Sequence, residues 1–418
     1  MEIVEVSLKT VYKYVITFIK WIILSTIMGL LGGLIGSLFH IAVEYVTDFR
    51  ICHSWIIYLL PIGGLIIIML YNLCKIDPNM GTNQIISSIR SDEKVTSVMA
   101  PLIFISTVIT HLFGGSAGRE GAALQLGGSV GNKLGRILGL DEKDMHIITM
   151  VGMSSVFSAL FGTPLTAIFF SMEVISVGVI YYVALVPCMI ASMIAYRMAI
   201  YFNIAPIDFM INKLPNFSVS LILKAVVVAI ACAVVSILFC ITLHKIEQKM
   251  SELIKNPYKR IFVGGLIVVL LTIILGTNDY NGAGMDIIQK AFRGQVVPYA
   301  FLLKILFTAI TIGAGFKGGE IVPTFFVGAT LGCLLGNLLG IPQGLGAAIG
   351  LISLFCGMVN TPIASIFLSI ELFGEVGLVY FAIAVGVSYM LSGYYGLYSS
   401  QKIVYSKLKA EYINKSAE

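Results

Sequence analysis

The sequence predicts an all-α membrane protein that crosses the bilayer many times and is built from two inverted repeats. Of its 418 residues 58% are hydrophobic and 12% are charged, and the mean hydropathy of +0.95 exceeds that of soluble globular proteins. About ten or more apolar stretches have helical length, which is enough for a large bundle. Many of them are shorter than a full crossing requires and recur in both halves, which is typical of transporters with broken helices.

The apolar segments follow one another along both halves. Residues 80–90 are too short and polar to cross a bilayer core of about 30 Å, so they predict only a short helix. The apolar segments of the first half are 11–49, 55–73, 100–112, 145–161, 163–177 and 181–202. Those of the second half are 219–243, 261–275, 299–312, 321–339, 345–358, 361–372 and 379–391. We expect one structural domain with halves 1–210 and 211–418, the second ending in a short tail.

The two halves also share sequence. Residues 152–173 align with 350–371 at an offset of 198, and nine of the 22 positions are identical. A ladder of glycines repeats at an offset of 201, as Gly127, Gly131, Gly135 and Gly139 and then Gly328, Gly332, Gly336 and Gly340. A spacing of four puts these glycines on one helix face, where another backbone can approach closely. Two apolar helices can match by chance, but agreement at both places favours an internal duplication.

Charge predicts the side of the membrane from which each half starts. Residues 244–260 hold five basic and two acidic side chains, and Lys9, Lys13 and Lys20 lie near the N-terminus. An excess of Lys and Arg marks cytoplasmic loops. We therefore expect helix 11–49 to leave the cytoplasm and helix 219–243 to return to it, so the repeats are inverted. Inversion brings loops of both halves together near the midplane of the bilayer.

Residues 114–139 are the strongest candidate for a functional site, because they place Arg119 and Glu120 between glycines. Charged side chains inside a membrane are costly unless partnered, and by default they mark a path for ions or protons. A glycine loop that opens onto a helix start also directs free N–H groups at one point, and such helix N-termini bind anions. We predict an intramembrane anion site with Glu120 beside it. The plainer alternative is a structural pairing of Glu120 with Arg119.

Other classes of function have little support in the sequence. The seven cysteines contain no CxxC pair and the five histidines do not cluster, so we predict no metal site and no cofactor. The basic residues are spread over loops, so no nucleic-acid partner is predicted. An intramembrane enzyme would need a nucleophile–base pair or a metal cluster within the spans. The sequence offers neither, so we do not expect an enzyme.

Three loops together resemble one family. They are the string G-R-E-G at 118–121 followed by Gln125, the G-x-x-x-P loop at 319–323, and Leu397-Tyr398-Ser399. In this order they resemble the CLC family of anion channels and proton-coupled anion transporters, over nearly the whole chain. The resemblance implies the CLC-type fold, in which broken or re-entrant helices meet at a midplane anion site. It also implies a compact prokaryotic protein of the cell membrane, and a homodimer whose interface includes the region of Phe169 and Phe367.

Asn83, Glu320 and Val174 distinguish between branches of that family. Chloride-handling members carry G-S-G-I-P where this chain has G-T-N-Q-I at 81–85, and isoleucine or a similar residue at the position of Glu320. Their antiporters have an inner proton-relay glutamate at the position of Val174. Asn83 and the string G-F-K-G-G-E that ends at Glu320 resemble the fluoride-exporting branch, CLC-F. That branch usually has threonine at the position of Val322.

Fluoride is small and strongly hydrated, so it leaves water only for several strong hydrogen-bond donors at once. The candidate anion-binding residues are Thr82, Asn83, Gly118, Arg119, Gly121, Gly319, Ile321 and Tyr398, those of the two glycine loops through backbone N–H groups. By resemblance Thr82 and Tyr398 hold the central anion, although Thr82 is not the best-known choice of CLC-F at that position. Without the resemblance, Thr82 is equally a helix N-cap and Tyr398 an interfacial aromatic.

Two carboxylates are the candidate proton carriers. Glu120 resembles the gating glutamate of the family, whose carboxylate occupies the anion's own site and swings away when protonated or displaced. Two negative charges a few ångströms apart repel strongly, so anion entry raises the affinity of Glu120 for a proton. Protonated Glu320 can donate a short hydrogen bond to fluoride. We predict that Glu320 carries protons with fluoride, in place of the relay missing at Val174.

The sequence thus predicts a homodimeric CLC-type transporter that exports fluoride in exchange for protons. The rival prediction is a chloride/proton antiporter or chloride channel of the same family, against which Asn83, Glu320 and Val174 argue. Lys317 either draws anions toward the site or pairs with Glu320. Glu173 and Glu371 end matching helices, and we expect them to pair or cap rather than to transport.

Overall fold

The described part of the chain folds into sixteen α-helices, eight in each half. The computed structural model describes residues 2–78, 80–91, 95–207, 209, 211 and 218–418, so the predicted boundary after residue 210 falls partly outside the described residues. The first eight helices are α1 (Glu2–Cys52), α2 (Leu60–Leu73), α3 (Thr82–Ser88), α4 (Met99–Leu112), α5 (Glu120–Ile137), α6 (Glu142–Phe161), α7 (Pro164–Glu173) and α8 (Leu185–Tyr201). The others are α9 (Val219–Leu253), α10 (Pro257–Leu275), α11 (Met285–Phe292), α12 (Ala300–Ala314), α13 (Ile321–Leu339), α14 (Leu345–Val359), α15 (Pro362–Phe373) and α16 (Leu378–Leu391).

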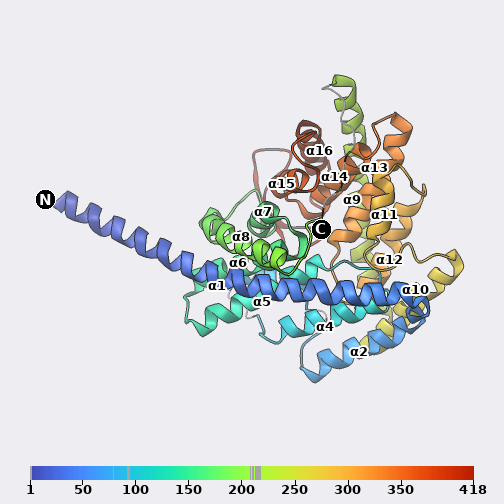
Figure 1. Cartoon of the computed structure of the whole chain (residues 1–418), viewed down its shortest axis with the longest axis horizontal. Coiled ribbons are helices and arrows are strands. Elements are labelled where there is room, and N and C mark those ends of the chain that lie inside the picture. Colours follow the sequence, from blue (N-terminus) through green and yellow to red (C-terminus); the bar gives the residue numbers. More distant parts are fainter. Residues whose placement is uncertain (1, 79, 92–94, 208, 210, 212–217) are drawn as a thin grey trace.

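Helix length and composition make the chain a multi-pass membrane protein. Seven spans within the described residues are long and apolar enough to cross a membrane, and shorter apolar helices accompany them. The 51 residues of α1 extend about 75 Å at 1.5 Å per residue, more than twice the thickness of a bilayer core. Accordingly α1 runs across the bundle and its N-terminal end projects beyond the other helices (Figure 1). From Trp21 onward its inner face is buried.

Each apolar segment predicted from the sequence corresponds to a helix, and the predicted short helix is α3. The predicted helical membrane fold is confirmed, with three differences in detail. The basic segment predicted as a loop at 244–260 is mostly helix, because α9 continues to Leu253. Residues 276–298, between two of the predicted apolar segments, contain α11. The all-α expectation also missed a small sheet of β1 (Ser176–Val177), β2 (Lys402–Tyr405) and β3 (Tyr412–Ser416), in that order, with β1–β2 parallel and β2–β3 antiparallel.

Matching helices of the two halves meet at the centre, where α7 lies beside α15 (Figure 1). The rings of Phe169 and Phe367 stack with centroids 4.4 Å apart. The Glu371 carboxylate accepts hydrogen bonds from the first free N–H groups of α7, at 2.7 and 2.9 Å. The Glu173 carboxylate does the same for α15, at 3.2 and 3.0 Å. Each glutamate therefore caps the helix of the other half, and the predicted capping role of both is confirmed.

The glycine ladders bring helices into close contact, as predicted. A β-carbon on Gly127 would lie 2.7 Å from the carbonyl carbon of Gly152 on α6, and one on Gly328 would lie 2.8 Å from the Cα of Leu351 on α14. Neither position admits a side chain. The last glycine of each ladder has a different role, since Gly139 and Gly340 have φ of 65° and 63° and follow the ends of α5 and α13. Left-handed glycines of this kind terminate helices.

Candidate anion site

The two glycine loops meet, as the inverted repeat predicts. The Gly118 N–H donates to Gly319 O at 2.6 Å, and the Gly319 N–H donates to Gly118 O at 2.7 Å. These residues are related by the offset of 201, and each stands directly before the helix cap, Arg119 for α5 and Glu320 for α13. A β-carbon on Gly319 would lie 2.8 Å from the backbone nitrogen of Glu120, so the approach requires glycine. The predicted anion binding by the Gly118 and Gly319 N–H groups is therefore wrong for this structure, because both donors are used in the pairing. The N-termini of α5 and α13 still converge, which favours negative charge between them.

The carboxylate of Glu120 lies between these two helix starts. It is 1% exposed, and its Oε2 accepts a hydrogen bond of 2.9 Å from the Arg119 N–H. It also interacts with the backbone N–H of Val322 on α13. The Arg119 side chain is close, with Nε 3.9 Å from Glu120 Oε1, so a charge pairing accompanies the backbone contacts. A carboxylate held in this way occupies the kind of position that an anion would take.

Glu320 and Tyr398 bring unpartnered polar atoms to the same place. Tyr398 is buried and Glu320 is half-buried, and the buried atoms Glu320 Oε2 and Tyr398 Oη have no hydrogen-bond partner within the described residues. A β-carbon on Gly121 would lie 3.0 Å from Glu320 Oε2 and 3.5 Å from Thr82 Oγ1, so these groups surround one small space. Tyr398 also interacts electrostatically with both Glu320 and Glu120. Its alternative interpretation as an interfacial aromatic is wrong, because its side chain is inside the protein.

Thr82 and Asn83 already take part in hydrogen bonds. Gly81, and not Thr82, is the N-cap of α3, so the N-cap interpretation of Thr82 is wrong. The Thr82 hydroxyl donates to Gly121 O at 3.3 Å and accepts from Gln125 Nε2 at 2.9 Å. Asn83 Oδ1 accepts from the Ser400 N–H at 3.1 Å, which leaves its Nδ2 donor for the adjacent cavity. Anion binding by either side chain stays a prediction.

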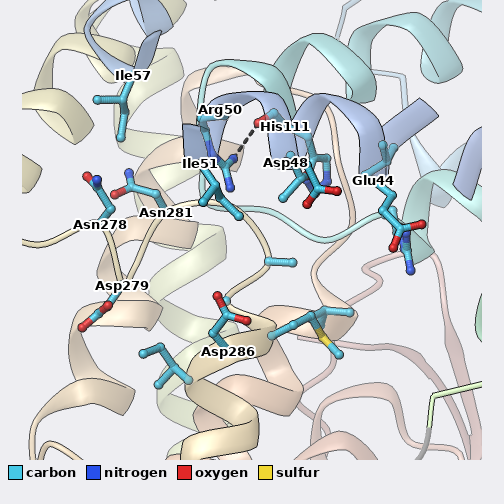
Figure 2. Close-up of a pocket in the computed structure, with 18 of the residues that line it drawn as sticks. Glu44, Asp48, Arg50, Ile51, Ile57, His111, Asn278, Asp279, Asn281 and Asp286 are labelled. Carbon is cyan, nitrogen blue, oxygen red and sulfur yellow. Dashed lines mark hydrogen bonds between the residues drawn. The ribbon is translucent and has the colours of Figure 1, made fainter. Parts of the chain in front are cut away.

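A cavity of about 500 Å³, which we call the acidic cavity, reaches the site from one side. Glu44, Asp48 and Arg50 of α1 face it, together with Asp279 before α11 and Asp286 in its first turn (Figure 2). Glu120 and Val322 line its inner end. Glu120 therefore borders this cavity, although it is only 1% exposed.

A second cavity of about 300 Å³, which we call the tyrosine cavity, is lined by Thr82, Asn83, Glu320 and Tyr398. Residues at the far end of α9, such as Glu247, also line it. The two cavities share no lining residue in the described part of the chain. The paired glycine loops and the Glu120 carboxylate therefore divide one cavity from the other.

Lys317 lines the tyrosine cavity and has neutral partners. Its Nζ donates to Pro78 O and lies 4.9 Å from the centre of the Tyr71 ring. The structure shows no ion pair between Lys317 and Glu320 within the described residues, although the two interact at longer range. This favours the alternative in which Lys317 draws anions into the cavity.

Two residues that support the first glycine loop by hydrogen bonds, His111 and Arg50, were not predicted from the sequence. His111 Nε2 lies 3.1 Å from Gly118 O, and because a carbonyl can only accept, this nitrogen carries the proton. Arg50 Nη1 donates to His111 O at 2.6 Å (Figure 2). A polar residue close before the loop was the one available signal for His111. Arg50 had none, since it lies 61 positions from its partner.

Comparisons with known proteins agree with this arrangement. A family model described as Voltage gated chloride channel matches residues 63–393. A chloride/fluoride channel protein of Pseudomonas syringae pv. tomato is 35% identical over 395 residues, which cover 93% of this chain and 87% of the relative. The crystal structure of a CLC-type fluoride/proton antiporter is similar with a TM-score of 0.88 and 33% identity, covering 92% of this chain and 98% of that one. A slow cyanobacterial Cl⁻/H⁺ antiporter is similar in fold, with a TM-score of 0.76 and 19% identity, covering 89% and 94%.

Proposed function

Because the chain belongs to the CLC family of voltage-gated chloride channels and related transporters, we propose that it is a fluoride/proton antiporter that exports fluoride from the cytoplasm. The family consists of channels and transporters, so the proposed activity is transport and not enzymatic catalysis. Two similar proteins carry fluoride in their descriptions, and one of them is a proton antiporter.

One observation carries the proposal. Glu320 is half-buried, and its buried oxygen Oε2 has no partner within the described residues, next to Gly121 and in the cavity that Tyr398 also lines. A buried polar atom without a partner costs about 1–3 kcal/mol, so the site gains by accepting a ligand. Ionised, Glu320 repels an anion. Protonated, it donates a strong hydrogen bond, which suits fluoride because the bond replaces part of a tightly held hydration shell.

Glu120 supplies the coupling in this proposal. Its carboxylate lies between the starts of α5 and α13, so an anion that enters must displace it or share the space with it. Repulsion between the two negative charges raises the affinity of Glu120 for a proton. A protonated Glu120 no longer competes for the helix N-termini and can turn toward the water of the acidic cavity. Proton uptake there and anion occupancy at the loops are therefore linked.

The basic residues at 244–260, most of which lie at the end of α9 and the start of α10, favour a cytoplasmic position for the tyrosine cavity, which the end of α9 lines. The acidic cavity then opens outward. Fluoride enters from the cytoplasm past Lys317, and protons enter from outside past Glu120. Cytoplasmic fluoride accumulates because hydrogen fluoride crosses membranes as a neutral molecule and ionises inside. The proton gradient drives its expulsion and so protects the cell.

We further propose a homodimer in the cell membrane of a prokaryote. The stacked rings of Phe169 and Phe367 are only partly buried within one chain. They lie where α7 and α15 meet, so one flat apolar surface joins equivalent helices of both halves. Such a surface suits contact with a second copy across a two-fold axis.

Purified protein in liposomes tests the function directly. The liposomes are loaded with fluoride or chloride, a pH gradient is imposed, and ion-selective electrodes follow halide efflux and proton uptake. We expect fluoride efflux to move protons inward and chloride efflux to be much slower. Chloride efflux equal to that of fluoride would support the rival chloride antiporter, and halide efflux without proton uptake would support a channel.

A further inference from the structure

The turn that carries Tyr398 is held from behind by a fully buried glutamine. The Gln401 N–H donates to Tyr398 O at 2.9 Å, and Gln401 O accepts from the Ala417 N–H at 2.9 Å. Gln401 is 0% exposed. A buried amide side chain requires partners for every donor and acceptor, so its surroundings show what it is built to hold.

The side chain of Gln401 joins the ends of two helices. Its Nε2 donates to Val174 O at the end of α7 and to Val359 O at the end of α14, both at 2.9 Å. Its Oε1 accepts from Asn360 Nδ2 at 3.0 Å. Both amide hydrogens and the amide oxygen are thus used, and none of these contacts points into the tyrosine cavity.

A half-buried ammonium group, that of Lys407, extends this network. Lys407 Nζ donates to Asn360 Oδ1 and to the Ser392 hydroxyl, and it lies 4.7 Å from the centre of the Tyr389 ring. An ammonium group can only donate, so Asn360 must turn its oxygen toward Lys407 and its Nδ2 toward Gln401. Gln401 then must turn its own Nε2 toward the two carbonyl groups. Backbone carbonyl groups require the same orientation, because Asn360 Nδ2 also donates to Tyr395 O at 3.0 Å.

We propose that Gln401 is a positioning residue that holds the Tyr398 hydroxyl at the distance an anion requires. This rests on the proposed function for the identity of the anion, but not for the role of the network. The Tyr398 hydroxyl has no hydrogen-bond partner within the described residues, so its position depends on the backbone turn and on packing of the buried ring. Binding sites lose affinity when supporting contacts leave a side chain loose by a fraction of an ångström.

The network also includes position 174. Val174 stands where the chloride antiporters of the family carry a relay glutamate. In this protein the backbone carbonyl of Val174 receives the donor of Gln401, and the parallel pairing of β1 with β2 continues the contact from Ser176 to Lys402. The end of α7 therefore anchors the turn that carries Tyr398.

Gln401→Met tests the proposal, because methionine fills the volume without the hydrogen bonds. We expect the fluoride Kd, measured by calorimetry, to rise about tenfold, the effect of weakening one hydrogen bond to a charged group. A 3-fluorotyrosine placed at position 398 should change its ¹⁹F chemical shift in the variant even without fluoride. The matched control is Lys402→Met, which removes the exposed bond from Lys402 Nζ to Ser416 Oγ and leaves the turn untouched, so both readouts should stay unchanged.

A double-mutant cycle separates positioning from a general structural role. If Gln401 acts through the hydroxyl of Tyr398, then Gln401→Met adds no further loss of affinity to Tyr398→Phe. Additive losses, or an unchanged chemical shift, would overturn the proposal. Gln401→Glu keeps the shape but turns an acceptor toward two carbonyl groups, so it must shift the resonance as well if Gln401→Met fails to fold. If the protein binds chloride instead of fluoride, the proposed function fails while the same cycle with chloride still decides the role of Gln401.

Discussion

The acidic cavity and the tyrosine cavity approach the same pair of glycine loops, but they differ in charge. The acidic cavity is lined by the carboxylates of Glu44, Asp48, Glu120, Asp279 and Asp286 and by the basic side chains of Arg50, Arg119 and Lys290. The tyrosine cavity is lined by Glu247 and Glu320 against Arg260 and Lys317. One cavity therefore has an excess of formal negative charge, and in the other the opposite charges balance.

This difference assigns separate tasks to the two cavities. A cavity with excess negative charge attracts protons and repels anions, because low-dielectric walls focus the field of its charges. In the proposed mechanism it favours proton delivery to Glu120 and opposes the return of an exported anion. A cavity with balanced charges admits anions, and protonation of Glu320 makes it positive. The asymmetry thus agrees with transport of fluoride in one direction and protons in the other.

We expect the largest effect from Glu120→Gln. Glu120 lines the acidic cavity and lies between the two helix starts, so this change removes a titratable group that both share. We expect proton movement under a fluoride gradient to be abolished, because glutamine has the shape of glutamate but carries no proton to exchange. A pH electrode in the liposome assay measures this. Glu142→Gln is the control, since Glu142 is exposed on α6 and lines neither cavity. Unchanged proton movement in Glu120→Gln would remove this residue from the coupling.

Glu320→Ala tests the other cavity and should have the next largest effect. We expect fluoride turnover to fall about tenfold to hundredfold, the range for loss of one hydrogen bond to a charged group. The fluoride electrode measures the turnover. Glu252→Gln removes an exposed carboxylate of the same α9–α10 region and should leave it unchanged. Normal turnover in Glu320→Ala would mean that fluoride does not depend on this carboxyl group.

Lys317→Met tests whether a positive charge attracts anions into the tyrosine cavity, and it should have the smallest effect. The neutral side chain can keep its packing on Tyr71 but no longer attracts anions, so we expect the KM for fluoride to rise about threefold, and less at high salt, where charges are screened. Efflux at several internal fluoride and salt concentrations measures this. Lys255→Met is the control, because Lys255 is exposed and lines neither cavity. A rise in KM that is independent of salt would point to lost packing instead.

Much of the site could be predicted because its parts repeat. The alignment at an offset of 201 predicted that the two glycine loops match, and the structure pairs Gly118 with Gly319 by two hydrogen bonds. The matching ends of α7 and α15 likewise predicted a structural role for Glu173 and Glu371. Their exchange of caps between the halves was not predicted, because a symmetric sequence does not state which copy of a helix start each carboxylate reaches.

Residues outside the repeat were harder to predict. A threonine at position 82 can either cap α3 or bond to Gly121, so its residue type does not distinguish these roles. In the structure its hydroxyl donates to Gly121 O. Hydropathy does not predict the helix α11, because this helix is short and polar on one side. Gln401 lies in a polar tail without periodicity, and 227 residues separate it from Val174.

Local hydropathy, charge and repetition suffice to predict the membrane environment, the helix order, the inverted duplication and the two carboxylates in the glycine loops. Which groups meet depends on the fold, which places Glu120 between two helix starts, Glu320 and Tyr398 in one cavity, and Gln401 behind the tyrosine turn. Hydrogen bonds form only between groups within about 3 Å of each other, and that proximity is a property of the folded chain.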